Sequence, residues 1–181
     1  MEAEPLADRP ARVAVEAGRA PGHRLALFAG LALTIAVVDQ LVKAWIVANF
    51  QVDRVVTILG DFVRIALSHN TGALFGLFRD QAPIFALFSL GVIALIVWYE
   101  WRAGSSLLVT LALGFLLGGA LGNLTDRLRL GYVVDFVDIG IGTFRWYTFN
   151  VADASISLSV LLLLLLAVRP SLGSAERGPG A

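Results

Sequence analysis

Two long stretches without a charged residue constrain this chain more than any other feature of its sequence. One extends from Gln81 to Tyr99, and the other extends from Ala103 to Thr125. The hydrocarbon core of a bilayer is about 30 Å thick, and a helix of about 20 mostly apolar residues crosses it. Both stretches have that length and composition, so the sequence predicts a membrane protein.

Two further stretches have the length of spanning helices and carry a few charges. Trp146–Val168 is interrupted only by Asp153, and Leu25–Ala48 carries Asp39 and Lys43 in its second half. The first half of Leu25–Ala48 also resembles the core of a signal peptide, but its apolar pattern continues and no small-x-small cleavage site follows. The predicted fold class is therefore a mainly α membrane protein with four transmembrane helices and both termini on one side.

Composition supports one membrane domain and excludes several kinds of chemistry. Hydrophobic residues make up 57% of the chain; counting glycine and omitting tyrosine gives roughly 65%, against about 45–50% in a soluble domain. We assign residues 25–168 to that domain and interpret residues 1–24 and 169–181, which lack periodicity, as flexible tails. The formal charge is zero, so nothing indicates nucleic-acid binding. The chain has no cysteine, which excludes disulfides, thiolate metal sites and thiol nucleophiles.

Two connecting segments have the pattern of short strands. Val52–Leu67 alternates and is rich in β-branched residues around Leu59-Gly60-Asp61, and Val133–Tyr147 has two short extended pieces around Gly140-Ile141-Gly142. Both segments lie on the side opposite the tails, where we expect a small β-hairpin and a second structured loop. Seven Lys and Arg residues on the tail side, against six on the opposite side, favour cytoplasmic termini.

Polar residues occur where the bilayer should exclude them, and such residues mark functional sites by default. Asp39 and Lys43 lie four residues apart on one helical face and can pair, either to neutralise each other for insertion or to face a substrate. Asn70 and Gly72 follow the first hairpin and belong either to an ordinary loop or to a polar site near the membrane surface.

More polar residues gather at helix ends on the hairpin side. Asn123, Asp126 and Arg127 lie within one turn at the end of the third predicted helix, where we expect Asp126 to pair with Arg127. A carboxylate beside a guanidinium stays ionised and transfers protons poorly. Asp135 and Asp153 meet near the membrane surface if the segment between them folds back; taken singly, one is a solvated loop acid and the other a favourable acid in a first helical turn.

The chemistry open to this chain is limited by its inventory. With two histidines and no cysteine, a metal site is not expected, and no motif for a nucleotide or another cofactor is present. Two carboxylates about 4 Å apart at an effective dielectric near 20 repel by roughly 4 kcal/mol, which raises one pKa by about three units. Such a pair shares one proton near neutrality, so one member activates water while the other protonates a leaving group.

Two alternatives remain open at this stage. A small proton-coupled transporter would use Asp39, Lys43, Asp126 and Asp153 as a relay. A Ser–Lys or Ser–His membrane protease would use Ser68, His69 or Lys43.

Four groups of motifs occur in order along the chain. They are Asp39-Gln40-x-x-Lys43; Asn70-Thr71-Gly72-Ala73-x-Phe75-Gly76; Gly122-Asn123-x-x-Asp126-Arg127 with Gly131-x-Val133-Val134-Asp135-Phe136; and Phe149-Asn150-x-Ala152-Asp153. Together they closely resemble the bacterial lipoprotein signal peptidase (signal peptidase II) family over residues 25–168. One departure is Leu74, where the family more often has alanine.

The resemblance implies an aspartic endopeptidase of the bacterial cytoplasmic (inner) membrane, with no cofactor. It would remove the signal peptide from diacylglyceryl-modified prolipoproteins by cutting just before the lipidated cysteine. Asp135 and Asp153 look like the catalytic dyad. Residues that look like substrate-binding or supporting positions are Asp39, Lys43, Asn70, Gly72, Asn123, Asp126, Arg127, Asn150 and Ala152. The expected partners are lipid-modified prolipoproteins and membrane lipids, the first hairpin is expected to form a β-cradle on the outer leaflet, and we expect a monomer.

Overall fold

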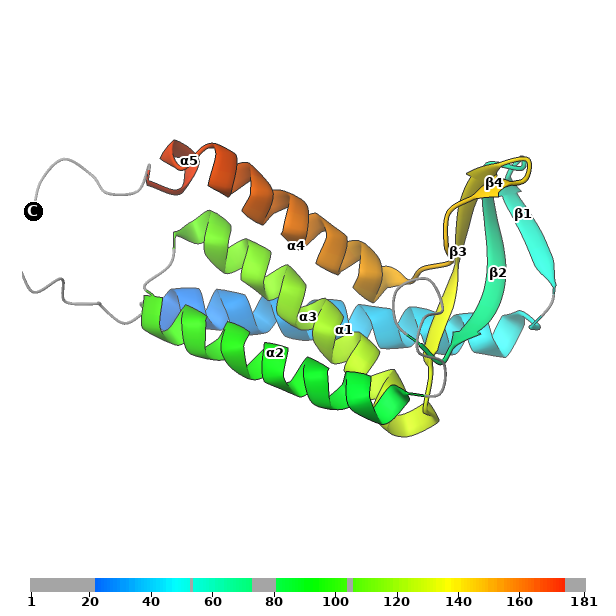
Figure 1. Ribbon diagram of the computed structural model, residues 1–181, viewed down its shortest axis with the longest axis horizontal. Coiled ribbons are helices and arrows are strands. Elements are labelled where there is room, and N and C mark those ends of the chain that lie inside the picture. Colours follow the sequence, from blue (N-terminus) through cyan, green and yellow to red (C-terminus); the bar gives the residue numbers. More distant parts are fainter. Residues whose placement is uncertain (1–21, 53, 73–80, 104–105, 175–181) are drawn as a thin grey trace, which may run out of the picture.

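The computed structural model describes residues 22–52, 54–72, 81–103 and 106–174. It contains four long helices: α1 (Gly22–Asn49), α2 (Ala82–Ala103), α3 (Leu107–Leu130) and α4 (Val151–Val168). All four are long and apolar enough to cross a membrane, which confirms the predicted fold class. In Figure 1 they form a bundle, with a small sheet at one end and a one-turn helix, α5 (Ser171–Ser174), at the other.

Some predicted boundaries are wrong. The fourth helix begins at Val151 rather than Trp146, and the third begins at Leu107, where the Ser106 hydroxyl caps it by accepting a hydrogen bond from the Val109 amide. The second helix continues beyond the uncharged stretch that ends at Tyr99, and it includes the buried Glu100. Residues 22–24 belong to α1 and residues 171–174 to α5, so only the parts of the predicted tails at 1–21 and 175–181 lie outside the described residues.

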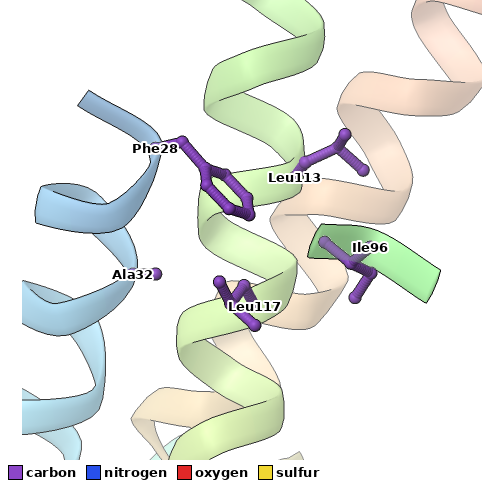
Figure 2. Packing of buried hydrophobic residues seen from close by; sticks show 5 residues of the cluster. All are labelled: Phe28, Ala32, Ile96, Leu113 and Leu117. Atoms are coloured by element: carbon purple, nitrogen blue, oxygen red, sulfur yellow. The ribbon is translucent and has the colours of Figure 1, made fainter. Parts of the chain in front are cut away.

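Helix α3 is the central element of the bundle. Figure 2 shows the apolar core that it forms with α1 and α2, from Phe28, Ala32, Ile96, Leu113 and Leu117. On the other side of α3, glycine allows close approach to α4: a Cβ added at Gly119 would lie 2.5 Å from the carbonyl oxygen of Ala152. Small residues that let helix backbones come together are typical of membrane bundles.

The sheet has four antiparallel strands in the order β1 (Val55–Leu59), β2 (Val63–Asn70), β3 (Val133–Ile141) and β4 (Phe144–Arg145). The predicted hairpin and the two extended pieces of the second segment are confirmed. The sequence did not predict that β2 pairs with β3 across the intervening α2 and α3. That pairing sets Ser68 opposite Asp135 and Asn70 opposite Val133, so the end of β2 lies beside the start of β3.

An apolar cluster attaches the sheet to the bundle. Ile46 of α1 packs with Leu67 of β2 and with Val134 and Phe136 of β3. Val134 and Phe136 flank Asp135 in the sequence. This cluster therefore fixes the position of the Asp135 backbone relative to α1.

Candidate active site

Predicted site residues from five elements converge where the bundle meets the sheet. Asp39 and Lys43 come from α1, Asn70 from β2, Asn123 and Asp126 from α3, Asp135 from β3, and Asn150 and Asp153 from the start of α4. Hydrogen bonds or ion pairs of 3.5 Å or less join them into one network.

Asp135 is 2% exposed and accepts a hydrogen bond on each carboxylate oxygen. The Nδ2 of Asn150 lies 2.7 Å from Oδ1, and the Nδ2 of Asn70 lies 3.0 Å from Oδ2. Burial first, and then the charge of Asp153, raise the pKa of Asp135 to about 7. Hydrogen bonds from the two asparagines act in the opposite direction but are outweighed.

Asp153 is held from two sides. It forms a capping box with Asn150: the Asp153 amide donates to Asn150 Oδ1 at 2.8 Å, and the Asn150 amide donates to Asp153 Oδ2 at 3.3 Å. The Nδ2 of Asn123 donates to the other oxygen, Oδ1, at 2.7 Å. Asp153 therefore lies in the first turn of a helix, which is one of the two interpretations that the sequence allowed. It is also a member of the polar network.

Asn150 connects the two acids. Its side-chain Nδ2 contacts Asp135, and its backbone amide and Oδ1 contact Asp153. It is 1% exposed, so the network around the two carboxyl groups is shielded from bulk water on this side. An acid with a pKa near 7 beside a second carboxylate is the arrangement needed to hold one proton between two groups.

Lys43 donates all three of its ammonium hydrogens within the bundle. Its Nζ lies 2.7 Å from Asp39 Oδ2, 2.9 Å from Asp126 Oδ2 and 3.0 Å from Asn123 Oδ1. The predicted Asp39–Lys43 pair is confirmed. A Ser–Lys mechanism needs a serine hydroxyl that donates to Nζ, whereas the contacts of Nζ are to two carboxylates and an amide oxygen, which disfavours the Ser–Lys alternative.

The predicted Asp126–Arg127 pair is wrong. Asp126 pairs with Lys43 instead, while the Arg127 guanidinium carbon lies 5.8 Å from the centre of the Phe85 ring. Adjacent residues on a helix point in different directions, so they seldom meet. Asp126 remains the weaker candidate for proton transfer, because its two carboxylate oxygens are occupied by the Lys43 ammonium and by the Gln40 side chain.

The remaining predicted positions act through their backbones. The Gly72 amide donates to Asn70 Oδ1 at 3.1 Å, and the Ala152 amide donates to Asp39 Oδ1 at 2.9 Å. Residues 73–76 of the motif lie outside the described residues.

Sequence reasoning gave no role to Gln40, whose Nε2 donates to Asp126 Oδ1 at 2.8 Å and to the carbonyl of Gly122 at 3.2 Å. The sequence feature that could have identified Gln40 is its position, because it is a second polar residue next to Asp39 in an apolar helix.

The described residues form neither a metal site nor a Ser–His site beside the buried acids. Within the part of the chain that the structure describes, no three His, Asp or Glu side chains are grouped as a metal site would need. His69 is exposed and stacks on Tyr132, with ring centroids 4.2 Å apart, rather than facing the buried acids.

Gly122 gives a test of how tightly this site is packed. A Cβ at this position would lie 2.6 Å from Asp39 Oδ2, so Gly122→Ala is expected to displace the Asp39 carboxylate and destabilise the fold by about 1–3 kcal/mol. A thermal melt in detergent measures the change. Gly91→Ala on α2 is the matched control: nothing lies within 4 Å of an added Cβ, so its melting temperature should stay equal or rise slightly. Equal melting temperatures for both variants would contradict the close contact.

Comparisons with known proteins agree with the motifs. Residues 31–169 match the family model described as signal peptidase (SPase) II. The lipoprotein signal peptidase of Moorella thermoacetica is 39% identical over 150 residues, which cover 82% of this chain and 97% of that protein. The lipoprotein signal peptidase of Beijerinckia indica is 41% identical over 143 residues, 75% of this chain and 84% of that protein. A solved bacterial membrane enzyme shares the fold, with a TM-score of 0.76 over 87% of this chain and 95% of its own, at 24% identity.

Proposed function

The chain belongs to the signal peptidase II family of membrane peptidases, and from that premise we propose that it removes the signal peptide from prolipoproteins whose cysteine carries a diacylglyceryl group. Cleavage occurs at the peptide bond just before that cysteine, and Asp135 and Asp153 form the catalytic dyad.

The observation that carries this proposal is the meeting of Asp135 and Asp153 around Asn150. The two acids come from different elements, and each has two hydrogen-bond donors that fix its orientation. Asp135, with a pKa of about 7, is the member that holds the shared proton near neutrality. Asp153 is then the ionised member.

Hydrolysis follows from these two states. Asp153 accepts a proton from water as the water oxygen attacks the scissile carbonyl carbon, while Asp135 gives its proton to the carbonyl oxygen. When the tetrahedral intermediate collapses, the proton on Asp153 passes to the departing amine, and Asp135 regains a proton as the carbonyl forms again. The dyad returns to its starting state without a metal ion or a covalent intermediate.

The proton-relay alternative fits the structure less well. Asp39, Lys43 and Asp126 pair with one another at a single end of the bundle, whereas a relay needs ionisable groups distributed through the depth of the membrane. We therefore assign these three residues to the architecture of the site.

The proposed location is the bacterial cytoplasmic membrane, with the termini in the cytoplasm and the active site on the extracytoplasmic side. An even number of spans puts the first and last helix ends on one side, and the sheet lies on the other (Figure 1). Exposed Trp146 and Tyr147 near the sheet, and exposed Trp98 and Tyr99 towards the opposite end of α2, suit the two membrane interfaces. A peptide bond beside a lipid anchor lies at the headgroup level, where water is present.

The substrate is tested with three synthetic precursor peptides and the purified full chain in nanodiscs. The peptides carry diacylglyceryl-cysteine, free cysteine or serine at the same position and are otherwise identical. We expect cleavage of the lipidated peptide at least about 100-fold faster than of the other two, because binding energy from the lipid helps to orient the scissile bond. Mass spectrometry should find the lipidated cysteine as the new N-terminal residue. Equal cleavage of all three peptides, or a cut at another bond, would contradict the proposal.

A further inference from the structure

Asp39, Lys43 and Asp126 form a buried ionic group, here called the Lys43 triad. Their exposed fractions are 0%, 3% and 2%, and the ammonium bridges the two carboxylates at 2.7 and 2.9 Å. The three residues carry a net charge of −1. Burying ionic groups is costly, and replacing such groups by neutral residues of similar volume is often neutral or stabilising.

Each carboxylate of the triad also accepts a hydrogen bond from a backbone amide that immediately precedes a dyad acid. Asp126 Oδ2 accepts from the amide of Val134, at 3.0 Å, and Val134 precedes Asp135. Asp39 Oδ1 accepts from the amide of Ala152, at 2.9 Å, and Ala152 precedes Asp153. One carboxylate thus holds the backbone of β3, and the other holds the start of α4.

The third hydrogen of Lys43 reaches the dyad through a side chain. It goes to Asn123 Oδ1 at 3.0 Å, and the Nδ2 of the same asparagine donates to Asp153 at 2.7 Å. A series of short polar contacts therefore runs from Asp153, through Asn123 and the triad, to the backbone amide of Val134 beside Asp135.

We propose that the Lys43 triad consists of positioning residues that set the separation of the Asp135 and Asp153 carboxyl groups. This inference rests on the dyad of the proposed function. The triad touches the backbone beside each acid and takes no part in proton transfer. Its effect on the rate is geometric, since displacing reacting groups by about 1 Å costs about 100-fold.

The competing explanation is that Asp39 and Lys43 only neutralise each other so that α1 can enter the membrane. That explanation gives Asp126 no role and does not require the two backbone contacts. It predicts that a neutral triad folds and works as well as the natural one.

The test is the triple variant Asp39→Asn/Lys43→Met/Asp126→Asn. It keeps side-chain volumes and the two acceptors for the backbone amides, but removes the ionic bridge without leaving an unpaired buried charge. We expect a folded protein whose kcat on the lipidated peptide is lower by about 100-fold and whose KM changes less than about threefold. If the triple variant does not fold, Asp39→Asn and Asp126→Asn each leave one ion pair intact and should lower kcat by about tenfold, with the same small change in KM.

A second readout reports the separation of the dyad without activity. The natural chain has no cysteine, so Asp135→Cys/Asp153→Cys introduces its only two thiols. Dibromobimane becomes fluorescent when it joins two neighbouring thiols, and we expect several-fold less cross-linking when the triad substitutions are added. A role limited to insertion or stability would lower the amount of folded protein and leave this yield per folded molecule unchanged.

The matched control is Glu100→Gln. Glu100 is also a fully buried carboxylate and accepts a hydrogen bond from Thr110 at 2.7 Å. It belongs to the last turn of α2, and that end of the helix lies away from the sheet (Figure 1). Its kcat, KM and cross-linking should stay within about twofold of the natural chain. The triad proposal is overturned if neutral triad variants keep their kcat and cross-linking, or if Glu100→Gln loses as much. Retained activity in Asp135→Asn would instead overturn the dyad, and the cross-linking yield would still judge the triad.

Discussion

Replacing either Asp135 or Asp153 with asparagine is expected to lower kcat on a diacylglyceryl-modified precursor by about 10⁴-fold, because the dyad supplies both the base and the acid of the reaction. Asparagine has nearly the shape of aspartate and fits the same space between Asn70, Asn123 and Asn150. It neither accepts a proton from water nor gives one to the carbonyl oxygen. The substitution therefore removes the chemistry while leaving the helices and the sheet in place.

Quantitative cleavage assays with the lipidated peptide measure this loss, and circular dichroism and thermal melts establish that the variants fold. Since the two acids act as one unit, the double variant Asp135→Asn/Asp153→Asn should lose no more activity than either single variant. Glu100→Gln shows what removing a buried carboxylate outside the site does. Activity within tenfold of the natural chain in either single variant is incompatible with the proposed dyad.

The four helices could be predicted from the sequence because the thickness of the bilayer sets the length of an uncharged run. The start of α4 could not, because apolar content alone does not separate a helix from an extended strand. Three of residues 146–149 are aromatic, yet this segment pairs with β3: the Trp146 amide donates to the carbonyl of Ile139 at 2.7 Å, and the Phe149 amide donates to the carbonyl of Val137 at 3.0 Å. The helix begins where Asn150 offers a side-chain cap.

Within the site, contacts between residues close in sequence could be predicted, and contacts between distant elements could not. Asp39 and Lys43 lie four residues apart, so helix periodicity predicts their pairing. Asn150 and Asp153 are also a local pair, but the sequence predicted only that Asp153 lies in a first helical turn, and the capping box appears in the structure. The bond from Lys43 to Asn123 joins residues 80 positions apart and depends on how α1 and α3 pack. Sequence spacing carries no information about such a contact, which is why Asp126 was assigned to its neighbour Arg127 instead of to Lys43.

Because the pKa of Asp135 is raised in the folded protein, the free energy of unfolding should depend on pH, and replacing Asp135 should remove that dependence. The folded protein holds this proton up to about pH 7, whereas an unfolded chain releases it near pH 3.9. Below pH 4 the carboxyl group is protonated in both states. As the pH rises from 4 to 7, the unfolded state alone loses its proton, so the natural chain loses about 1.4 kcal/mol of stability per pH unit, up to about 4 kcal/mol.

Asp135→Asn removes that titration, so the free energy of unfolding of the inactive variant should increase relative to that of the natural chain as the pH rises. Between pH 5 and pH 8 the difference in the free energy of unfolding should grow by about 3 kcal/mol, or about 10 °C in melting temperature. Melts of both proteins at four pH values in this range measure it. The comparison uses the change with pH, because asparagine also alters the hydrogen bonds with Asn70 and Asn150 by an amount independent of pH.

Asp138, three residues further along β3, provides a control, because its pKa is shifted in the direction opposite to that of Asp135. Burial alone would raise its pKa, but hydrogen bonds from Arg145, at 2.9 Å, and from Arg64, at 2.6 and 2.9 Å, hold the pKa of Asp138 below its usual value. Its stabilisation is present above the unfolded pKa and is lost only as the pH falls through the lower folded value. Asp138→Asn should therefore be less stable than the natural chain by the same amount at pH 5 and pH 8. If the difference for Asp135→Asn is equally flat, the folded protein does not hold a proton on Asp135 at neutral pH, and the acid of the proposed mechanism must be sought elsewhere.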